Sequence, residues 1–395
     1  MSDTQKHTKP NVPNLRFPGF EGEWERCTLG EIGEPYIGLT YSPADVVNEG
    51  GTIVFRSSNI QNGEIDYSDI VRVNKKIKDS IITRKDDLLI CARNGSPRLI
   101  GKNALLKDAD AGQTFGAFML VFRSNDNHFV HQLLSTKGYY SQVSENLGAR
   151  INQITTSNIK DFEFYFPKSI AERNKIADFL NLIDERISIQ NKVIEDLKKL
   201  KTALCEQLYN EHNPNSHIGD LIEQKSIRNR VGEDLKVLSV SNRYGFIEQS
   251  EQFEDRTVAS EDTSNYKIVS LNDFAYNPAR INVGSVARLK YFDKGIVSPM
   301  YICFHCKDNV RPEFLEHFFS TKFFYLEMEK RLEGSVRMCL SFEGMCNIPI
   351  HIPSYEMQMD IGKKITVLND KLGLEESYSK NLKIHKQYLL SQLFI

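Results

Sequence analysis

The sequence predicts a mixed α/β protein with two globular domains whose cores are β-rich α/β, separated by two long antiparallel coiled-coil helices and related by an internal pseudo-two-fold repeat. Three observations support this fold class. The chain repeats itself at an offset of about 185 residues. Each half contains short alternating apolar runs bounded by turn residues, which are typical of strands. Each half then ends in a long heptad pattern, which is typical of a coiled coil.

Length and composition favour an ordinary globular protein. The 395 residues, 40% hydrophobic and 26% charged, are enough for two or three domains that each bury a core. No apolar stretch is long enough for a membrane span, so we expect a soluble protein. Residues 1–14 have no apolar run, and we interpret them as a disordered lead-in instead of a signal peptide. Seven scattered cysteines indicate a reducing cytoplasm more than a disulfide framework.

The overall charge argues against tight, independent binding to nucleic acid. Lys and Arg number 50 and Asp and Glu number 52, so the net charge is -2. A protein that holds DNA alone usually has a strongly basic footprint. The sequence therefore leaves room for basic patches on one face, or for a partner that supplies much of the phosphate contact.

The repeat is clearest at the end of each half. STKGYYSQVSENLGARINQ and NIKDFEFYFP, which end at Pro167, correspond to STKFFYLEMEKRLEGSVRM and CNIPIHIP, which end at Pro353. The alternating apolar residues before each proline predict a strand that stops there. Weaker pairs are collinear with this match, namely 29–32 with 218–221 and Asp87-Leu88 with Asp273-Phe274.

The repeated strands and turns place two globular domains at 15–168 and 213–353. Runs such as GTIVFRSSNI, DDLLICA and FGAFMLVF predict strands. Helical spacing of aromatic and aliphatic residues predicts shorter helices at 128–147 and 312–333.

Two spacer helices are predicted at 169–212 and 354–395. At ~40 residues and ~1.5 Å per residue, each is too long to be covered by one small domain, so the two must pack on each other. A duplicated chain of domain, helix, domain and helix most simply folds about an internal two-fold axis, with antiparallel helices and one domain towards each end of the coil. The predicted seam, which steps by fours and threes, is Ile176, Leu180, Ile183, Ile187, Ile194, Leu197, Leu204 and Leu208, followed by Ile361, Ile365, Leu368, Leu372, Leu382, Leu389 and Leu393.

Polar residues interrupt both seams at matching places. Gln190 aligns with Glu375, and Lys201 aligns with Lys386. Polar seam residues cost stability, so they can serve to set the register or to receive a partner. They can equally be solvated side chains beside a frayed seam, and the sequence leaves both interpretations open.

Three loop clusters in each half carry side chains that read bases or hold phosphates. Arg and Asn offer fork-shaped hydrogen bonding that distinguishes guanine and adenine in the major groove, and Ser can contact base or phosphate. Lysines such as Lys198, Lys199 and Lys201 are expected to touch the DNA backbone or a partner. The candidate DNA-contact residues are Arg56, Ser57, Ser58, Asn59, Arg93, Asn94, Arg98, Lys102, Arg150, Asn152 and Gln153 in the first half, and Ser241, Asn242, Arg243, Tyr244, Asn277, Arg280, Asn282, Arg288 and Arg337 in the second.

Nearly the whole chain, from about Leu15 onward, resembles the specificity subunits of type I restriction-modification enzymes. The resemblance rests on NLRFPGFEGEWERCTLGEI and on SIAERNKIADFLNLIDERISIQNKVIEDLKKLKTALCEQLY, which is similar to the central spacer helix of that family. The second spacer, from Tyr355, departs in detail and keeps mainly its heptad.

This resemblance implies a non-catalytic DNA-recognition subunit of the bacterial or archaeal cytoplasm that serves in defence against foreign DNA. Each domain would read one half of a split double-stranded DNA target, and the helices would fix the gap. Two modification subunits carrying S-adenosylmethionine would methylate adenine, and two restriction subunits using ATP and Mg²⁺ would translocate and cleave DNA. The chain itself is expected to bind no cofactor.

Signatures of catalysis are incomplete in this sequence. GSPRLIGKN, at 95–103, has the wrong spacing for a phosphate-binding loop and has Asn103 where Ser or Thr must meet magnesium. Asn277 to Arg280 is a poor likeness of the adenine-holding loop of amino-methyltransferases. Asp220, Glu223 and Lys225 could imitate a nuclease cluster, but we place them on a short helix or turn with no following strand and favour a solvated face.

A metal site is not expected. Cys303 and Cys306, with Cys339 and Cys346 downstream, could in principle ligate zinc. However, YICFHC is predicted to be a strand, which would direct Cys303 and Cys306 to opposite faces. His128 and His131 are interpreted as helix surface or cap residues.

Two other functions are weighed against DNA recognition. A coiled-coil adaptor or scaffold with protein-binding globular ends would give no sequence-dependent DNA protection when a modification subunit is added. A duplicated enzyme acting on a nucleotide or sugar needs a complete set of catalytic groups in one half. If the bases are read as predicted, mutating Arg56 or Arg243 should weaken one half-site only.

Overall fold

The computed structural model describes residues 11–147, 152–210, 213–242, 244–249, 263–334 and 337–395. Arg150, Arg243 and residues 1–10 of the predicted lead-in lie outside the described residues. The chain forms two compact units. Unit 1 comprises Met1–Lys192 and Ser377–Ile395, and unit 2 comprises Val193–Glu376. The units divide each long helix, so the predicted boundaries between domains and spacers stay predictions.

Unit 1 is built around an antiparallel sheet with the strand order β2 (Glu34–Ile37), β11 (Met119–Arg123), β8 (Leu88–Cys91) and β9 (Asn103–Leu105). Both faces of this sheet are buried, because alternate residues of β8 and β11 enter different clusters. Leu88 and Ile90 pack with the helices, whereas Leu89 and Cys91 pack on a second sheet. A strand buried on both faces has no polar alternation, which explains the continuous apolar run LLIC.

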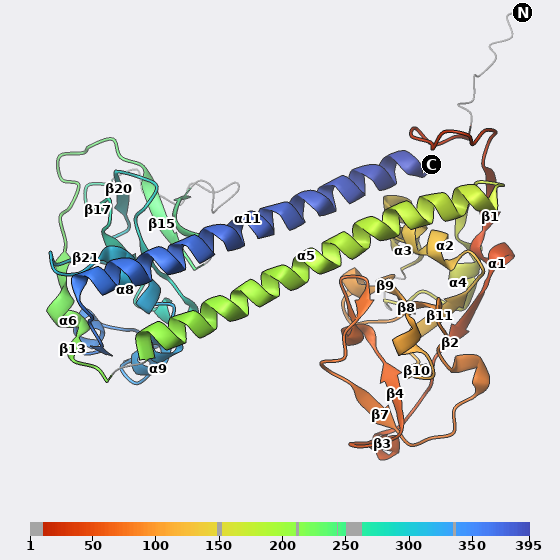
Figure 1. The fold of residues 1–395 in the computed structure, drawn as a ribbon, viewed down its shortest axis with the longest axis horizontal. Helices are drawn as coiled ribbons and strands as arrows, with labels where there is room; N and C mark the ends of the chain where they lie inside the picture. The colour runs from red at the N-terminus through yellow and green to blue at the C-terminus, as the bar shows by residue number, and fades with distance from the viewer. Residues whose placement is uncertain (1–10, 148–151, 211–212, 243, 250–262, 335–336) are drawn as a thin grey trace, which may run out of the picture. The chain divides into compact units, whose positions relative to one another are not determined.

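The second sheet of unit 1 has the order β10 (Thr114–Phe115), β4 (Thr52–Phe55), β7 (Val71–Val73) and β3 (Val46–Val47), and β10 is parallel to β4. The unit also contains the pair β5 (Ile60–Gln61) and β6 (Glu64–Ile65), and the pair β1 (Glu25–Thr28) and β12 (Glu163–Phe166). Its short helices are α1 (Leu29–Ile32), α2 (Asn127–Leu133), α3 (Lys137–Asn146) and α4 (Thr156–Asp161). The globular part of unit 1 lies to one side of α5 (Figure 1).

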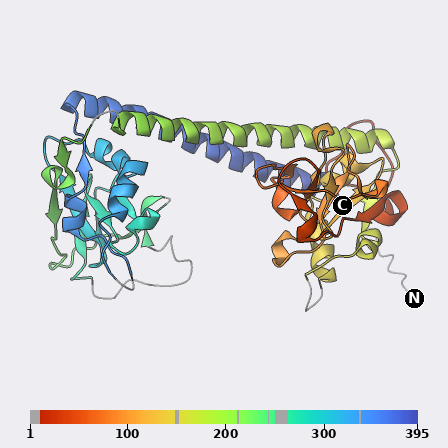
Figure 2. The same ribbon diagram turned by 90° about the horizontal axis from the view of Figure 1, so that it is seen from below.

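Unit 2 repeats this plan. Its first sheet has the order β14 (Ile222–Lys225), β21 (Ile302–Cys306), β18 (Phe274–Tyr276) and β19 (Val286–Arg288), which corresponds strand for strand to β2, β11, β8 and β9. The strands β13 (Ser216–His217) and β22 (Pro349–Ile350) pair as β1 and β12 do. Its short helices are α6 (Ile218–Leu221), α8 (Pro312–Phe318), α9 (Lys322–Glu329) and α10 (Phe342–Cys346). Figure 2 shows these elements to one side of the helix segments of unit 2. The predicted internal repeat is therefore confirmed.

The second sheets differ at one edge. In unit 2 the order is β16 (Gly245–Glu248), β15 (Val237–Ser241), β20 (Lys294–Val297) and β17 (Lys267–Ser270). The parallel pair β15 and β20 corresponds to β4 and β10. In unit 1 the fourth strand, β3, pairs with β7, whereas in unit 2 the fourth strand, β17, lies at the opposite edge, beside β20. The duplication has therefore kept the core strands and changed the periphery.

Several local predictions need correction. Each segment predicted as one short helix forms two helices. Thr136 and Thr321 lie between the two helices of their segments. Each caps the second helix, because its side chain accepts a hydrogen bond from the backbone N–H three residues later. A strand does follow the 218–221 turn, since β14 begins at Ile222 and includes Glu223. Ser241, which is predicted to lie in a loop, is the last residue of β15.

The interpretations of Cys303 and Cys306 and of residues 95–103 agree with the structure. Cys303 and Cys306 lie on a strand and pack in different clusters. Within the described residues no group of three His, Cys, Asp or Glu could hold a metal ion. The segment 95–103 forms a 3-10 turn at Pro97–Leu99 and begins β9, instead of the strand, loop and helix of a phosphate-binding loop. Among the described residues, no helix is long and apolar enough to cross a membrane.

The two long helices are α5 (Ile170–Asn210) and α11 (Tyr355–Leu393). Every predicted seam residue is buried or partly buried. In unit 1, Lys386 Nζ lies 2.6 Å from Asp184, and Ser379 Oγ donates to Asn191 Oδ1 at 3.0 Å. Residue numbers rise along α5 as they fall along α11, so the segments run antiparallel, as predicted. In unit 2, Lys198 pairs with Glu376 at 2.6 Å.

The structure decides the role of one polar interruption in the seam. Lys386 is 9% exposed, and its ammonium group contacts both carboxylate oxygens of Asp184. The amide of Gln132 on α2 also donates to Asp184 Oδ2, at 2.8 Å. This partnered, buried lysine fixes the register of the helix pair in unit 1 and is not a solvated side chain.

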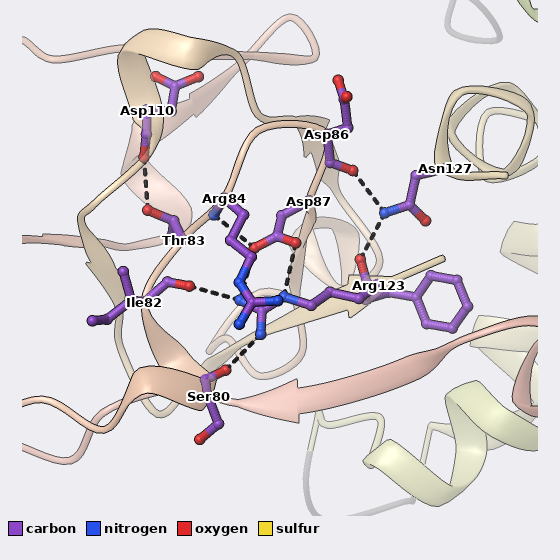
Figure 3. Close-up of polar contacts among 10 residues, drawn as sticks. Ser80, Ile82, Thr83, Arg84, Asp86, Asp87, Asp110, Arg123 and Asn127 are labelled. Carbon is purple, nitrogen blue, oxygen red and sulfur yellow. Dashed lines mark hydrogen bonds and ion pairs between the residues drawn. The ribbon is translucent and has the colours of Figure 1, made fainter. Parts of the chain in front are cut away.

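In unit 1 a polar cluster lies at the start of β8 and the end of β11 (Figure 3). Arg123 donates from Nε and Nη2 to the two carboxylate oxygens of Asp87, each at 2.9 Å, and also donates to the backbone oxygens of Ser80 and Ile82. Asn127 joins the cluster by donating to the backbone oxygen of Asp86 at 2.7 Å. This ion pair therefore joins the end of β11 to the residue that precedes β8.

Candidate nucleic-acid interface

In unit 1 the structure brings together candidate residues from three separate loops. Asn94 Nδ2 donates to Ser57 Oγ at 2.9 Å, and the backbone N–H of Asn94 donates to the oxygen of Asn152 at 3.3 Å. The amide of Asn152 donates in turn to the oxygen of Gly95 at 3.1 Å. An isolated antiparallel bridge joins Arg93 to Gln153. We call Ser57, Arg93, Asn94, Asn152 and Gln153 the unit 1 cluster.

Strand ends position this cluster. Ser57 begins the 3-10 turn that follows β4, and Arg93 and Asn94 come directly after β8. The third loop is anchored to the second, since Ile154 donates from its backbone N–H to the oxygen of Ala92 at 2.9 Å. The ends of two sheets and one anchored loop therefore present polar side chains at one place.

Some candidate residues of unit 1 hold the loops themselves. Arg56 pairs with Asp69 at 2.8 Å, and Asn59 is buried. The Asn59 amide accepts from the backbone of Arg56 and donates to the oxygens of Asp66 and Asp69. The contacts of these two side chains stabilise the fold of the 56–69 segment. The remaining candidates Ser58 and Arg98 are exposed, and Lys102 is partly buried.

Sequence reasoning missed Phe118 in this cluster. Its ring is 58% exposed, and the guanidinium of Arg93 lies 5.0 Å from the ring centroid. Its backbone oxygen accepts hydrogen bonds from the N–H groups of Ala92 and Arg93, at 3.0 and 2.9 Å. The only sequence signal was an apolar residue placed one position before the buried β11, and such a residue is easily taken for part of the strand.

In unit 2 the three candidate loops meet around a cavity of about 730 Å³. The exposed candidates at its wall are Asn242, Arg280 and Arg337. Asn277 is buried there and accepts a hydrogen bond from the backbone of Ala279 at 3.1 Å. We call the candidate residues at this cavity, together with Met300, the unit 2 cluster, which consists of Ser241, Asn242, Asn277, Arg280, Met300 and Arg337.

Three further candidates of unit 2 have other surroundings. Tyr244 and Asn282 are exposed and do not line the cavity. Arg288 is 10% exposed in its side chain and forms ion pairs with Glu313 at 2.8 Å and with Glu316 at 3.0 Å. This arginine joins β19 to α8, so its guanidinium is committed to the fold.

The two clusters have the chemistry of recognition. Their polar side chains include guanidinium groups, which donate hydrogen bonds, and amide groups, which both donate and accept them. Burial raises the pKa of the Cys91 thiol to about 11 and that of Cys303 to about 12, so both thiols stay protonated at neutral pH. Neither cysteine can supply a thiolate nucleophile beside its cluster.

Comparison with known proteins confirms the resemblance found in the sequence. Residues 21–199 match the sequence model of the family described as type I restriction modification DNA specificity domain. The chain is 25% identical over 186 residues to the type I restriction enzyme StySPI specificity subunit of Salmonella potsdam, which is 45% of this chain and 40% of that protein. It is 26% identical over 185 residues to the EcoKI specificity subunit of Escherichia coli K12, covering 45% and 39%. The chain thus matches about two fifths of the length of these curated relatives.

A solved structure shares the fold over almost the whole chain. The S subunit of a type I restriction-modification system from M. genitalium superposes with a TM-score of 0.62, at 17% identity, over 97% of this chain and 99% of that one. The predicted fold class, with its mixed α/β units and long helices, is therefore confirmed.

Proposed function

We propose that this chain, whose residues 21–199 carry a type I restriction modification DNA specificity domain, is the sequence-recognition subunit of a type I restriction-modification complex. It reads a bipartite DNA target and directs adenine methylation and DNA restriction by partner subunits. The observation that carries the proposal is the recurrence of one polar cluster at the same place in two units whose residues differ. Two equivalent surfaces with different side chains suit two half-sites of different sequence.

Guanidinium and amide side chains supply the reading chemistry. In unit 1, the exposed Arg93 offers a fork of donors that suits guanine, and the partly buried Asn94 and Asn152 carry amide groups of the kind that suits adenine. In unit 2, Arg280, Arg337 and Asn242 offer the same two kinds of group. With a net charge of -2, the chain relies on partners for much of the phosphate contact.

A second apolar stripe on the long helices supports the proposal of two modification subunits. On α5, the exposed residues Leu182, Ile189, Val193 and Leu200 step by seven, four and seven, which is heptad spacing. On α11, Val367, Leu374 and Tyr378 are exposed at the positions 185 residues later. Each helix therefore presents an equivalent apolar face to which a helical segment of a partner can pack.

Catalysis belongs to the partner subunits in this proposal. The modification subunits carry S-adenosylmethionine, and the restriction subunits use ATP and Mg²⁺. This chain supplies recognition and assembly and acts in the bacterial or archaeal cytoplasm.

The test is to express the full chain with its modification subunit and to map methylated adenines across the genome. We expect a split, asymmetric motif. Arg93→Ala should reduce methylation by about fivefold or more because it weakens recognition of one half of the motif, and Arg280→Ala should do the same for the other half, since one good arginine contact discriminates by about 1–3 kcal/mol. Arg26→Ala and Arg228→Ala replace exposed arginines outside the clusters and should leave the motif unchanged.

Two results would contradict the proposal. One is a methylation pattern that does not depend on this chain, which is what a coiled-coil adaptor would give. The other is equal weakening of both halves by either cluster variant, because each unit is assigned one half-site.

A further inference from the structure

Each unit exposes one large apolar side chain at the same point of the repeated fold. Phe118 in unit 1 is 58% exposed, and Met300 in unit 2 is 60% exposed. Each lies in the turn that follows the parallel strand of its second sheet, three residues after the last residue of β10 or β20. In unit 1 the central strand β11 begins directly after Phe118. In unit 2 the central strand β21 begins after one further residue.

The strand register establishes that the two positions are equivalent. Asp87 and Asp273 match in the repeat, so Ile90 matches Tyr276. Ile90 pairs with Leu120, and Tyr276 pairs with Ile302. Phe118 and Met300 each come two residues before these paired positions. Their shared exposure is therefore a property of the repeated fold and does not come from chance placement of two unrelated residues.

Both side chains lie among the groups assigned to base reading. Phe118 lies under the guanidinium of Arg93, and its backbone oxygen holds the N–H of the same residue. Met300 lies at the wall of the unit 2 cavity with Arg280, and its sulfur is 3.8 Å from Asn277 Nδ2. A hydrogen-bonding surface with one exposed apolar side chain at equivalent positions has the composition needed to read thymine, whose major-groove edge carries an acceptor and a methyl group.

We propose that Phe118 and Met300 are specificity-determining residues, each of which contacts the C5-methyl group of a thymine in the half-site read by its own unit. This inference rests on the proposed function and adds to it the apolar part of base recognition. The two side chains differ in shape, since one is a flat ring and the other a flexible thioether. The difference suits half-sites of different sequence.

The experiment tests whether each side chain is responsible for the effect of a thymine methyl group on DNA binding. The full chain with its modification subunit is bound to duplexes that carry the mapped target, in which each thymine in turn is replaced by uracil, which lacks only the methyl group. For the wild type we expect one replacement in each half-site to weaken binding about fourfold, the effect of one buried methyl group. Phe118→Ala should abolish this sensitivity in one half-site and keep it in the other, and Met300→Ala should do the reverse.

Matched controls separate recognition from folding. Tyr140→Ala in unit 1 and Tyr291→Ala in unit 2 remove exposed aromatic rings outside the clusters and should keep both sensitivities. Melting temperatures of all four variants should stay close to that of the wild type, because the side chains removed are exposed.

Three outcomes overturn the inference. They are a wild type with no methyl sensitivity in a half-site, a Phe118→Ala or Met300→Ala variant that keeps the sensitivity of its own half-site, and a variant that weakens binding equally at every position. Failure of the proposed function looks different, since the wild-type complex would then have no split target at all.

Discussion

Among single residues, an aspartate lies at the matching position of both halves, but the basic residue that pairs with it differs. Asp87 directly precedes β8 and pairs with Arg123 on β11, and Asp273 directly precedes β18 and pairs with Lys225 on β14. Each carboxylate also accepts a hydrogen bond from the backbone N–H three residues earlier, which closes the turn before the strand. In both units the aspartate closes the turn before the strand. The basic residue that pairs with it lies on β11 in unit 1 and on β14 in unit 2.

Arg123→Met is expected to destabilise unit 1 by about 3 kcal/mol, because it leaves the buried carboxylate of Asp87 without its charge partner. Urea unfolding followed by the fluorescence of Trp24, the single tryptophan, reports on this unit. The control is Lys85→Met, which removes an exposed ion pair with Asp108 and should change stability by less than about 1 kcal/mol. Equal effects of the two variants would refute the structural role of the buried pair.

Histidines with a lowered pKa recur in the two units. His128 is exposed, as predicted, and His131 is partly exposed in the last turn of α2, which agrees with its interpretation as a helix surface or cap residue, although its Nδ1 atom is buried. Burial lowers the pKa of His131 to about 4, and burial does the same for His317, which is 4% exposed and contacts Thr366. In both units, therefore, the folded state holds a neutral imidazole.

The pH dependence follows from this lowered pKa. Above pH 6.5, the ordinary pKa of histidine, both states are neutral and His317 has no effect. Between pH 6.5 and about 4 the unfolded chain binds a proton that the folded chain does not, so stability is lost, up to roughly 3 kcal/mol for His317. Unfolding measured across this window should show a shallower loss for His317→Gln, whereas the exposed His128→Gln should follow the wild type. Parallel profiles for all three proteins would contradict the assignment.

At the scale of elements, α5 shows two apolar faces of different purpose. Leu180 is fully buried in the core of unit 1, whereas Leu182, two positions later, is 65% exposed. Residues two apart lie on different sides of a helix, so the first face builds the fold and the second is available to a partner. The heptad pattern includes Leu180 in the predicted seam and leaves Leu182 outside it, and the exposure of the two residues agrees.

Leu180→Ala should destabilise unit 1 by about 3 kcal/mol, because it opens a cavity in a packed core. Leu182→Ala should change stability by less than about 0.5 kcal/mol and should instead weaken association with the modification subunit. Urea unfolding and titration with that subunit measure the two effects separately. If Leu182→Ala destabilised the fold as much as Leu180→Ala, the face assigned to partner binding would belong to the core.

At the level of the whole chain, unit 1 is built from two separate stretches of the sequence. The last 19 residues, Ser377–Ile395, belong to unit 1, although all of unit 2 precedes them in the chain. Leu390, Leu393 and Phe394 enter the same core cluster as Trp24. The backbone N–H of Leu15 also donates to the oxygen of Gln392 at 2.9 Å. The two ends of the described chain are thus joined within one core.

Truncation after Glu376 is expected to unfold unit 1 and to spare the sheets of unit 2, because it removes buried side chains only from the first core. Hydrogen exchange measures this directly. Amides of β8 and β11 should lose protection, and those of β18 and β21 should keep it. Removing Ile395 alone, which is exposed, is the control and should change neither unit. Equal loss in both units would mean that the C-terminal segment stabilises the whole chain.

The repeat, the strands, the two long helices and the seam that joins them could be predicted from the sequence, because they depend on periodicities of two and of about 3.5 residues that are visible along the chain. The loops of both clusters could be located in the same way. The structure was needed to see that Arg56, Asn59 and Arg288 are held by the fold, and that Phe118 and Met300 are exposed among the polar groups. Whether a side chain is committed or available depends on neighbours that are distant in sequence, and packing alone brings those neighbours together.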